Sequence, residues 1–353
     1  MKAIHSKRRR DQGRGIALLA LLCLTGACQR HGPLGEKAFV APERLKLKSS
    51  TAQAARYTSE LPGGTLVTVT DRDLSEEGVL WAEIRGPEPE SRVGWVENRF
   101  LIKADLVEAS RRLEAEIRTT PTQAVGRSKA TLKLRLTPDR TAEENVITVV
   151  SSGSLLEIVR RERRPRPTTP LSSVPESDDF VTTPPVTLPP DQKSDDWYLV
   201  RTPSLPVAPA GWIYGGSVNL EVPPEIVYFV STGRRITGWH KLGTAHDQFG
   251  RPGDHYLVLE HRVFGGIDEL DFDRVKILAY DPLTRNYLTP FQEDLSGRFP
   301  VTVSMLDNRG HFELTAADRS GQSRLHRYQI DVNTDGALRV TRIAPLPNRA
   351  SRR

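Results

Sequence analysis

Histidine is the residue type whose clustering here would most directly indicate metal chemistry, because neutral imidazole is a common metal ligand. Six of the eight histidines lie in the last third of the chain. No two of them stand four residues apart beside a glutamate, the spacing that places two imidazoles on one helix face. We therefore expect scattered surface or core histidines and no metal site. The six are His240, His246, His255, His261, His311 and His326.

Acidic residues suggest calcium binding at two places. Residues 331–336 begin like a calcium loop, but Arg339 and Arg342 occupy its ninth and twelfth positions, where oxygen ligands are needed. A hairpin turn explains the same residues. The second place is an acidic cluster, for which we expect solvated charge: Asp268, Glu269, Asp271 and Asp273.

Motifs for nucleophilic or phosphoryl chemistry are absent from the sequence. It contains no Gly-x-Ser-x-Gly, no phosphate loop and no His-Glu-x-x-His, and serines such as Ser304 have no base at motif spacing. We expect no catalytic residue, no cofactor and no enzymatic activity.

The two cysteines, Cys23 and Cys28, both lie near the N-terminus, where their chemistry is tied to export. Residues 1–27 combine a basic start, a short apolar stretch and a small-residue exit, which indicates a secretory signal. The exit, residues 24–28, resembles the lipobox of bacterial lipoproteins. That resemblance implies cleavage before Cys28, whose thiol would then carry diacylglycerol and bind membrane lipid. Ordinary signal-peptidase cleavage is the alternative, since Thr25 and Ala27 are small.

The net charge of +6 comes mostly from this segment. Without residues 1–27 the chain has 44 basic and 43 acidic residues, so its charge is close to +1. The composition therefore gives no reason to expect a nucleic-acid partner. Residues 348–353 form a basic tail, and residues 28–38 are expected to be a tether.

The middle of the chain contains an internal repeat. Leu45-Lys46-Leu47 matches Leu134-Arg135-Leu136 at an offset of 89 residues, and a Gly-led apolar stretch after Gly64 matches the one after Gly153 at the same offset. Trp81 then matches Trp197 at an offset of 116, and Gly94-Trp95-Val96 matches Gly211-Trp212-Ile213 at 117. The second copy therefore carries an insertion of 27 residues, placed in the Pro-rich stretch at about 163–194.

Taken together and in the same order twice, these motifs resemble bacterial SH3 (SH3b) domains. The resemblance implies two small antiparallel barrels, at residues 39–102 and 130–220. Both copies depart from the family's usual Leu-Asn-Val-Arg opening strand. Between them, residues 103–129 are expected to form a helix and linker, with Leu106, Ala109, Leu113 and Ile117 on its apolar face.

The last part, residues 221–347, alternates apolar stretches with Asn/Asp/Gly turns, which indicates an antiparallel β-meander or sandwich. The expected strands include residues 275–280, 301–306, 312–316, 325–332 and 338–343. The predicted fold class is thus all-β and multi-domain: two SH3-like barrels with one linking helix, followed by a β-rich C-terminal domain.

Aromatic side chains are the best candidates for ligand binding, because Trp and Tyr stack on sugars and flat peptide surfaces. The SH3b resemblance places six of them at core or groove positions. They are Tyr57, Trp81, Trp95, Trp197, Tyr198 and Trp212.

From these observations we expect an exported, lipid-anchored envelope protein that binds peptidoglycan or peptide ligands without catalysis. In a two-membrane cell, Gln29 after Cys28 favours the outer membrane, on the periplasmic side. Two alternatives stay open: an envelope scaffold that binds partner proteins, and a hydrolytic or metal-dependent activity in the C-terminal domain.

Overall fold

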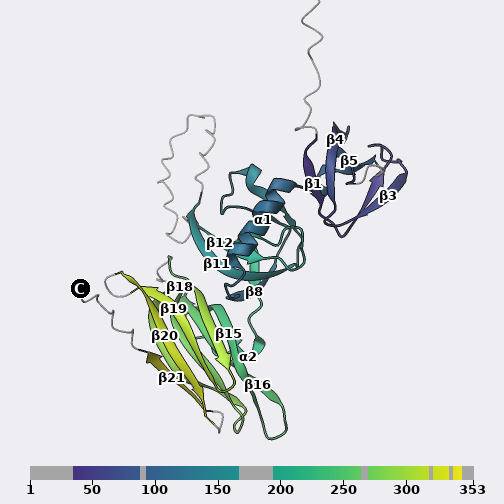
Figure 1. Ribbon diagram of the computed structural model, residues 1–353. Helices are drawn as coiled ribbons and strands as arrows, with labels where there is room; N and C mark the ends of the chain where they lie inside the picture. Colours follow the sequence, from purple (N-terminus) through teal and green to yellow (C-terminus); the bar gives the residue numbers. More distant parts are fainter. Residues whose placement is uncertain are drawn as a thin grey trace, which may run out of the picture.

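The computed structural model describes residues 35–87, 93–166, 194–263, 269–317, 321–333 and 337–343. Within these ranges the chain forms three antiparallel sheets of seven strands each, with two α-helices (Figure 1). The predicted all-β, multi-domain fold class is confirmed. The signal segment with Cys28, most of the Pro-rich insertion and the basic tail lie outside the described residues. None of the described helices combines the length and apolar character that crossing a bilayer requires.

The first barrel, barrel 1, owes its core to strands that alternate between inward apolar and outward polar residues. In β2, for example, Leu45 and Leu47 are buried while Lys46 is exposed. The strands follow the order β3-β2-β6-β5-β4-β1-β7 across the sheet. They are β1 (Lys37–Val40), β2 (Arg44–Lys48), β3 (Tyr57–Pro62), β4 (Leu66–Leu74), β5 (Leu80–Arg85), β6 (Val93–Glu97) and β7 (Leu101–Lys103).

The second barrel, barrel 2, repeats this topology strand for strand in the order β10-β9-β13-β12-β11-β8-β14. Gly64 and Gly153 both adopt a φ of +79°, and β4 and β11 both shift register at equivalent positions, after Val69 and after Ile158. The strands are β8 (Ala124–Ser128), β9 (Leu132–Arg135), β10 (Val146–Val150), β11 (Leu155–Pro165), β12 (Ser194–Arg201), β13 (Ala210–Tyr214) and β14 (Val218–Leu220).

Barrel 2 begins earlier than the sequence suggested. Strand β8 lies within residues 103–129, the range expected to hold only helix and linker. The insertion, in contrast, falls at the tip of the β11–β12 hairpin, whose last described pair is Pro165 opposite Ser194.

Helix α1 (Ala104–Ile117) joins the two barrels and packs on the outside of barrel 2. Its buried residues are Val107, Ser110 and Ile117, and Leu113 packs on the same side. The Ser110 hydroxyl donates a hydrogen bond of 2.6 Å to the Ala210 carbonyl on β13. The apolar spacing in the sequence had predicted this helix.

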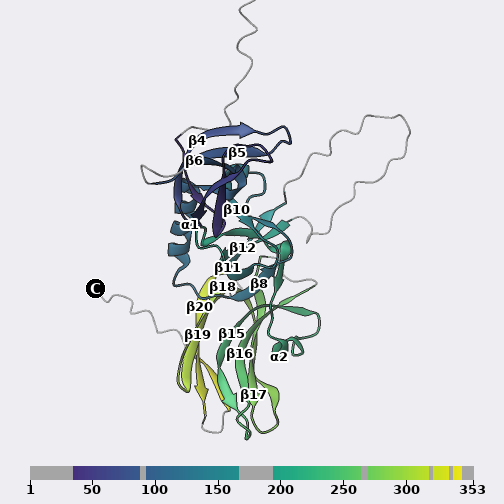
Figure 2. The same ribbon diagram turned by 90° about the vertical axis from the view of Figure 1, so that its right-hand side faces the viewer.

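The C-terminal domain is a meander in which each strand pairs with the next. Strand β18 pairs with β17 through its first half and with β19 through its second half, so the sheet folds over a core around Phe272, Phe312 and Tyr328 (Figure 2). The strands are β15 (Arg234–His246), β16 (Pro252–Arg262), β17 (Phe272–Asp281), β18 (Asn286–Leu306), β19 (Arg309–Ala317), β20 (Ser323–Val332) and β21 (Leu338–Ile343). Helix α2 (Pro224–Val227) contributes Ile226 to a second cluster, with Val258 and Leu278.

Both junctions between these bodies are built from buried contacts. Phe39 and Ile102 of barrel 1 pack with Val107 against the core of barrel 2. At the other junction, the Gln123 side chain accepts a hydrogen bond of 2.8 Å from the Val301 N–H and donates one of 3.0 Å to the Val301 carbonyl. Gln123 thus acts like one residue of a neighbouring strand and joins barrel 2 to β18.

Candidate functional site

Two indoles lie together on the outer surface of barrel 1. Trp81 on β5 and Trp95 on β6 are partly exposed, while the residues that follow them, Ala82 and Val96, point into the core. Because Trp95 stands opposite Glu83 and Trp81 opposite Glu97, the two indoles are diagonal neighbours on one face of the sheet.

Lysines from β2 complete this surface. Lys48 pairs in register with both Tyr57 and Trp95, and its Nζ lies 5.2 Å from the ring centre of Trp81 and 5.9 Å from that of Tyr57. Nζ of Lys46 lies 5.6 Å from the Tyr57 ring. Within the described ranges neither lysine forms an ion pair with a carboxylate, so the positive charge of each can attract an anionic group of a ligand.

Glu83 supplies a hydrogen-bond acceptor beside the indoles. Its carboxylate accepts a hydrogen bond of 2.7 Å from the Thr70 hydroxyl. We call this set the aromatic face: Tyr57, Trp81, Trp95, Lys46, Lys48 and Glu83. It combines π surfaces, cations and an acceptor, as needed to hold a sugar ring or an extended peptide with carboxylates.

The equivalent surface of barrel 2 is closed. Trp197 and Trp212 are only 2% and 6% exposed, because Leu113 and Ile117 of α1 pack over them. The repeat offsets pair Thr70 with Val159, Glu83 with Leu199 and Glu97 with Tyr214, so polar positions in barrel 1 are apolar or aromatic in barrel 2. Trp197 and Trp212 therefore belong to the packing of the helix against the barrel, and we no longer assign them to ligand binding.

Tyr198 lies on the opposite side of β12 from its neighbour Trp197. It packs with the core of barrel 2 and borders a cavity at the junction with the C-terminal domain. Burial raises the pKa of its phenol. Of the six predicted aromatic residues, the structure thus brings three together on barrel 1 and separates the other three from that surface.

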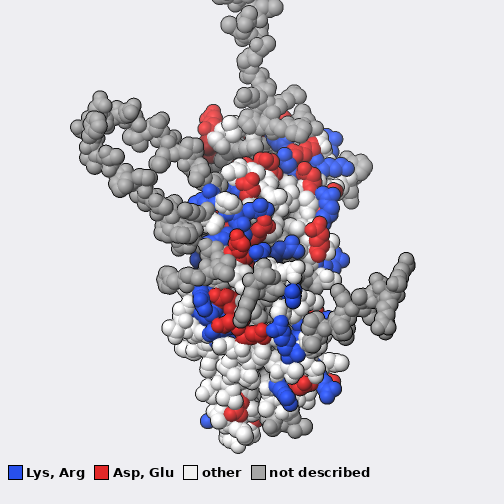
Figure 3. Space-filling view, turned by 90° about the vertical axis from the view of Figure 1, so that its left-hand side faces the viewer, with Lys and Arg blue, Asp and Glu red and all other residues white. Residues whose placement is uncertain are grey.

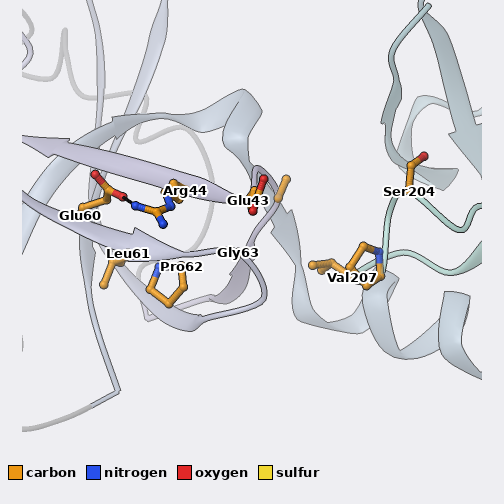
Figure 4. Close-up of a pocket in the computed structure, with 10 residues that line it drawn as sticks. Glu43, Arg44, Glu60, Leu61, Pro62, Gly63, Ser204 and Val207 are labelled. Carbon is orange, nitrogen blue, oxygen red and sulfur yellow. Dashed lines mark hydrogen bonds and ion pairs between the residues drawn. The ribbon is translucent and has the colours of Figure 1, made fainter. Parts of the chain in front are cut away.

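A cleft of about 710 Å³ between the two barrels was not foreseen from the sequence (Figure 4). One wall is formed by the start of β2 and the end of β3, where Arg44 pairs with Glu60, and the other by the loop with Ser204 and Val207. No pattern in the sequence could reveal this cleft, because its walls come from different copies of the repeat. It contains none of the six predicted residues.

The histidines are distributed over β15, β16, β19 and β20, and the described residues contain no group of His, Cys, Asp or Glu suited to hold a metal ion. His255 and His261 are buried in β16, whereas His246 and His311 are exposed. Asp271 and Asp273, from the acidic cluster, are engaged by Arg161 and Arg234.

Charges of both signs are intermixed over the two barrels on the face shown in Figure 3, in keeping with the near balance of basic and acidic residues after residue 27. No protein-family model matches this sequence, and no curated protein matches it.

Proposed function

We propose that this chain is a non-catalytic binding protein of the bacterial cell envelope and that its ligand contacts the aromatic face of barrel 1. The observation that carries the proposal is the contrast between the two copies. The same pair of tryptophans is covered by a helix in barrel 2 but left partly exposed in barrel 1, beside two lysines that form no ion pair with any described carboxylate.

Peptidoglycan, including its peptide stems, is the ligand that this chemistry favours. Sugar rings would stack on Trp81 and Trp95, and the stem carboxylates would approach Lys46 and Lys48. Glu83 would accept hydrogen bonds from hydroxyl or amide groups. The resemblance to SH3b domains supports the same choice.

A binding assay with purified peptidoglycan tests this proposal. We expect the mature chain to sediment with the polymer at low salt and the double variant W81A/W95A to lose binding by roughly tenfold or more, since truncating a tryptophan that anchors a ligand commonly costs about 2 kcal/mol or more. Tyr228→Ala is the matched control, because Tyr228 is an aromatic residue that is 87% exposed elsewhere, after α2. If saturating peptidoglycan leaves the wild-type chain in the supernatant, the proposal is wrong.

Lipid attachment at Cys28 would hold the chain at the membrane, on the periplasmic side of the outer membrane in a two-membrane cell. Replacing the thiol tests this part separately. Cys28→Ser should release the chain from the membrane fraction of intact cells. Persistent membrane partition of that variant would exclude the thioether lipid as the tether.

Binding of an envelope partner protein is the second candidate. It is favoured by β3, which ends the sheet of barrel 1 and borders the cleft between the barrels with mostly exposed residues. An edge strand can pair with an added strand of another chain. Cross-linking in cells that captures one protein through β3, with no peptidoglycan binding in the assay above, would support this candidate instead.

A further inference from the structure

A second cavity, separate from the aromatic face, lies where barrel 2 meets the C-terminal domain. It has a volume of about 260 Å³ and draws its walls from both bodies. We call it the junction cavity. The lining residues that matter here are Lys129, Arg161, Asp196, Tyr198 and Gly215 of barrel 2 and Arg235 and Phe299 of the C-terminal domain.

Comparison of the two barrels shows how the space beside Tyr198 arises. In barrel 1, Arg72 occupies the position of Arg161, and its Nε donates a hydrogen bond of 3.4 Å to the side chain of Asn98. The repeat offset pairs Asn98 with Gly215 in barrel 2. A Cβ atom at Gly215 would lie 3.0 Å from the Tyr198 ring. The polar side chain that fills this place in barrel 1 is therefore missing in barrel 2.

The walls of the junction cavity carry an excess of positive charge. Arg161 is neutralised by Asp196, at 2.7 Å, and donates a hydrogen bond of 2.6 Å to the Leu270 carbonyl, which ties the two bodies together. Lys129 and Arg235 are exposed, and among the residues that the structure describes neither pairs with a carboxylate. The Lys129 ammonium donates a hydrogen bond of 3.1 Å to the Gly216 carbonyl.

Tyr198 adds a neutral donor to these two cations. Burial raises the pKa of the phenol, the nearby Asp196 carboxylate raises it further, and together they outweigh the opposite effect of Arg161 and Arg235. The hydroxyl therefore keeps its proton near neutral pH and can donate it to a bound oxygen. A phenol, an ammonium and a guanidinium around one small space form a donor set for an oxyanion.

We propose that the junction cavity is a binding site for a small oxyanion, the carboxylate or phosphate of a compact molecule, held by Tyr198, Lys129 and Arg235. The cavity is slightly smaller than the roughly 300–1,000 Å³ of drug-sized ligand pockets, which limits the ligand to a few carbon atoms beyond the anionic group. Because Arg235 and Lys129 come from different bodies, the ligand also bridges the junction. This site is independent of the aromatic face and of the function proposed for it.

Isothermal titration of the mature chain tests the site, with inorganic phosphate, glycerol 3-phosphate and succinate as probes at constant ionic strength in chloride. We expect saturable 1:1 binding of at least one probe. Binding of glycerol 3-phosphate but not of succinate would identify a phosphate ligand. Binding of succinate but not of glycerol 3-phosphate would identify a carboxylate ligand. Arg235→Gln and Tyr198→Phe should each weaken binding by roughly tenfold, because each removes a hydrogen bond to a charged group.

Arg251→Gln is the matched control, since Arg251 is an exposed arginine on the β15–β16 hairpin with no contact to the cavity. It should bind the probes as the wild type does. The proposal is overturned if none of the three probes gives saturable heat, or if Arg235→Gln binds as tightly as Arg251→Gln. Because Arg235 is exposed, its replacement should not impair folding, which circular dichroism will check.

Discussion

Trp95 and Trp212 occupy equivalent positions on β6 and β13, yet their surroundings give them different roles. Trp95 has Glu83 opposite it and Lys48 beside it, and its indole is partly exposed. Trp212 has Leu199 opposite it and Ile117 packed over it. A large aromatic side chain contributes to stability mainly through the area that it removes from water. The two tryptophans should therefore respond differently to truncation.

We predict that Trp212→Ala lowers the free energy of unfolding by about 3–5 kcal/mol, the usual cost of emptying a core site of this size. Trp95→Ala should cost roughly 1 kcal/mol or less, because solvent already reaches the indole. Urea unfolding followed by circular dichroism measures both. Equal destabilisation by the two substitutions would contradict the assignment of Trp95 to an open surface.

His240 provides a second prediction, about pH. Its Nε2 is buried without a hydrogen-bond partner in the described part of the chain, and burial lowers the pKa of the imidazole from 6.5 to about 4. Below pH 6.5 the unfolded chain binds a proton that the folded chain does not. The contribution of His240 to stability should therefore fall as the pH drops from about 6.5 to about 4, by at most about 3 kcal/mol.

The variant His240→Leu should flatten this part of the pH profile, whereas His246→Gln, at an exposed histidine, should keep it. Thermal unfolding at a series of pH values is the measurement. A His240→Leu profile as steep as that of the wild type would show that other groups cause the acid sensitivity.

Much of the residue-scale detail was predictable from strand alternation, which points Trp81 and Trp95 outward and Ala82 and Val96 inward. What alternation cannot give is the identity of the element that covers an outward residue. A signal for the difference was nevertheless present. Glu83 in one copy is replaced by Leu199 in the other, and an outward-facing leucine between tryptophans indicates a covered surface.

Helix α1 is the element that decides which barrel keeps an open face. Its last turn places Ile117, 1% exposed, against Trp197 and Trp212. We predict that Ile117→Asp, which buries an unpaired carboxylate, destabilises barrel 2 by about 3 kcal/mol or more. Ala115→Asp places the same charge on the exposed side of the same helix and should change the stability little.

Tryptophan fluorescence distinguishes the two variants. In Ile117→Asp the emission should shift to the red, because the helix end leaves the indoles of barrel 2 in contact with water. If Ile117→Asp has the same emission and the same stability as the wild type, α1 does not shield these indoles.

At the scale of elements, the sequence located the strands bounded by Asn/Asp/Gly turns, but it did not single out β15, β16 or the first half of β18. The five expected C-terminal strands all fall within β17 to β21. Strand β8 was missed because it has only five residues and Gly126 at its centre. That glycine is required by tertiary contact, since a Cβ there would lie 2.7 Å from Val218 of β14, which no local pattern encodes.

For the molecule as a whole, Gln123 determines how barrel 2 and the C-terminal domain are held together. The side chain is fully buried and satisfies both backbone groups of Val301. We predict that Gln123→Ala weakens the junction by about 1–3 kcal/mol, the cost of leaving buried backbone groups unpaired. Limited proteolysis should then cleave between the two bodies faster than in the wild type.

Gln329→Ala, at an exposed glutamine on β20, is the control and should leave the cleavage rate unchanged. If Gln123→Ala is cleaved as slowly as Gln329→Ala, the apolar contacts alone hold the junction together. This contact was not predictable from the sequence, because Gln123 and Val301 are 178 positions apart and no motif links them.

The covering of one barrel by α1 has a consequence for valency. A chain with two barrels suggests bivalent binding, but only one of the described barrels leaves its tryptophans accessible. Under the proposed function, each chain should therefore bind the polymer at a single site and dissociate quickly. Long-lived attachment to a repeating polymer would then require many copies of the chain close together on one surface, so that one copy binds the polymer when another dissociates. Retention should accordingly rise steeply with the number of copies displayed per unit area.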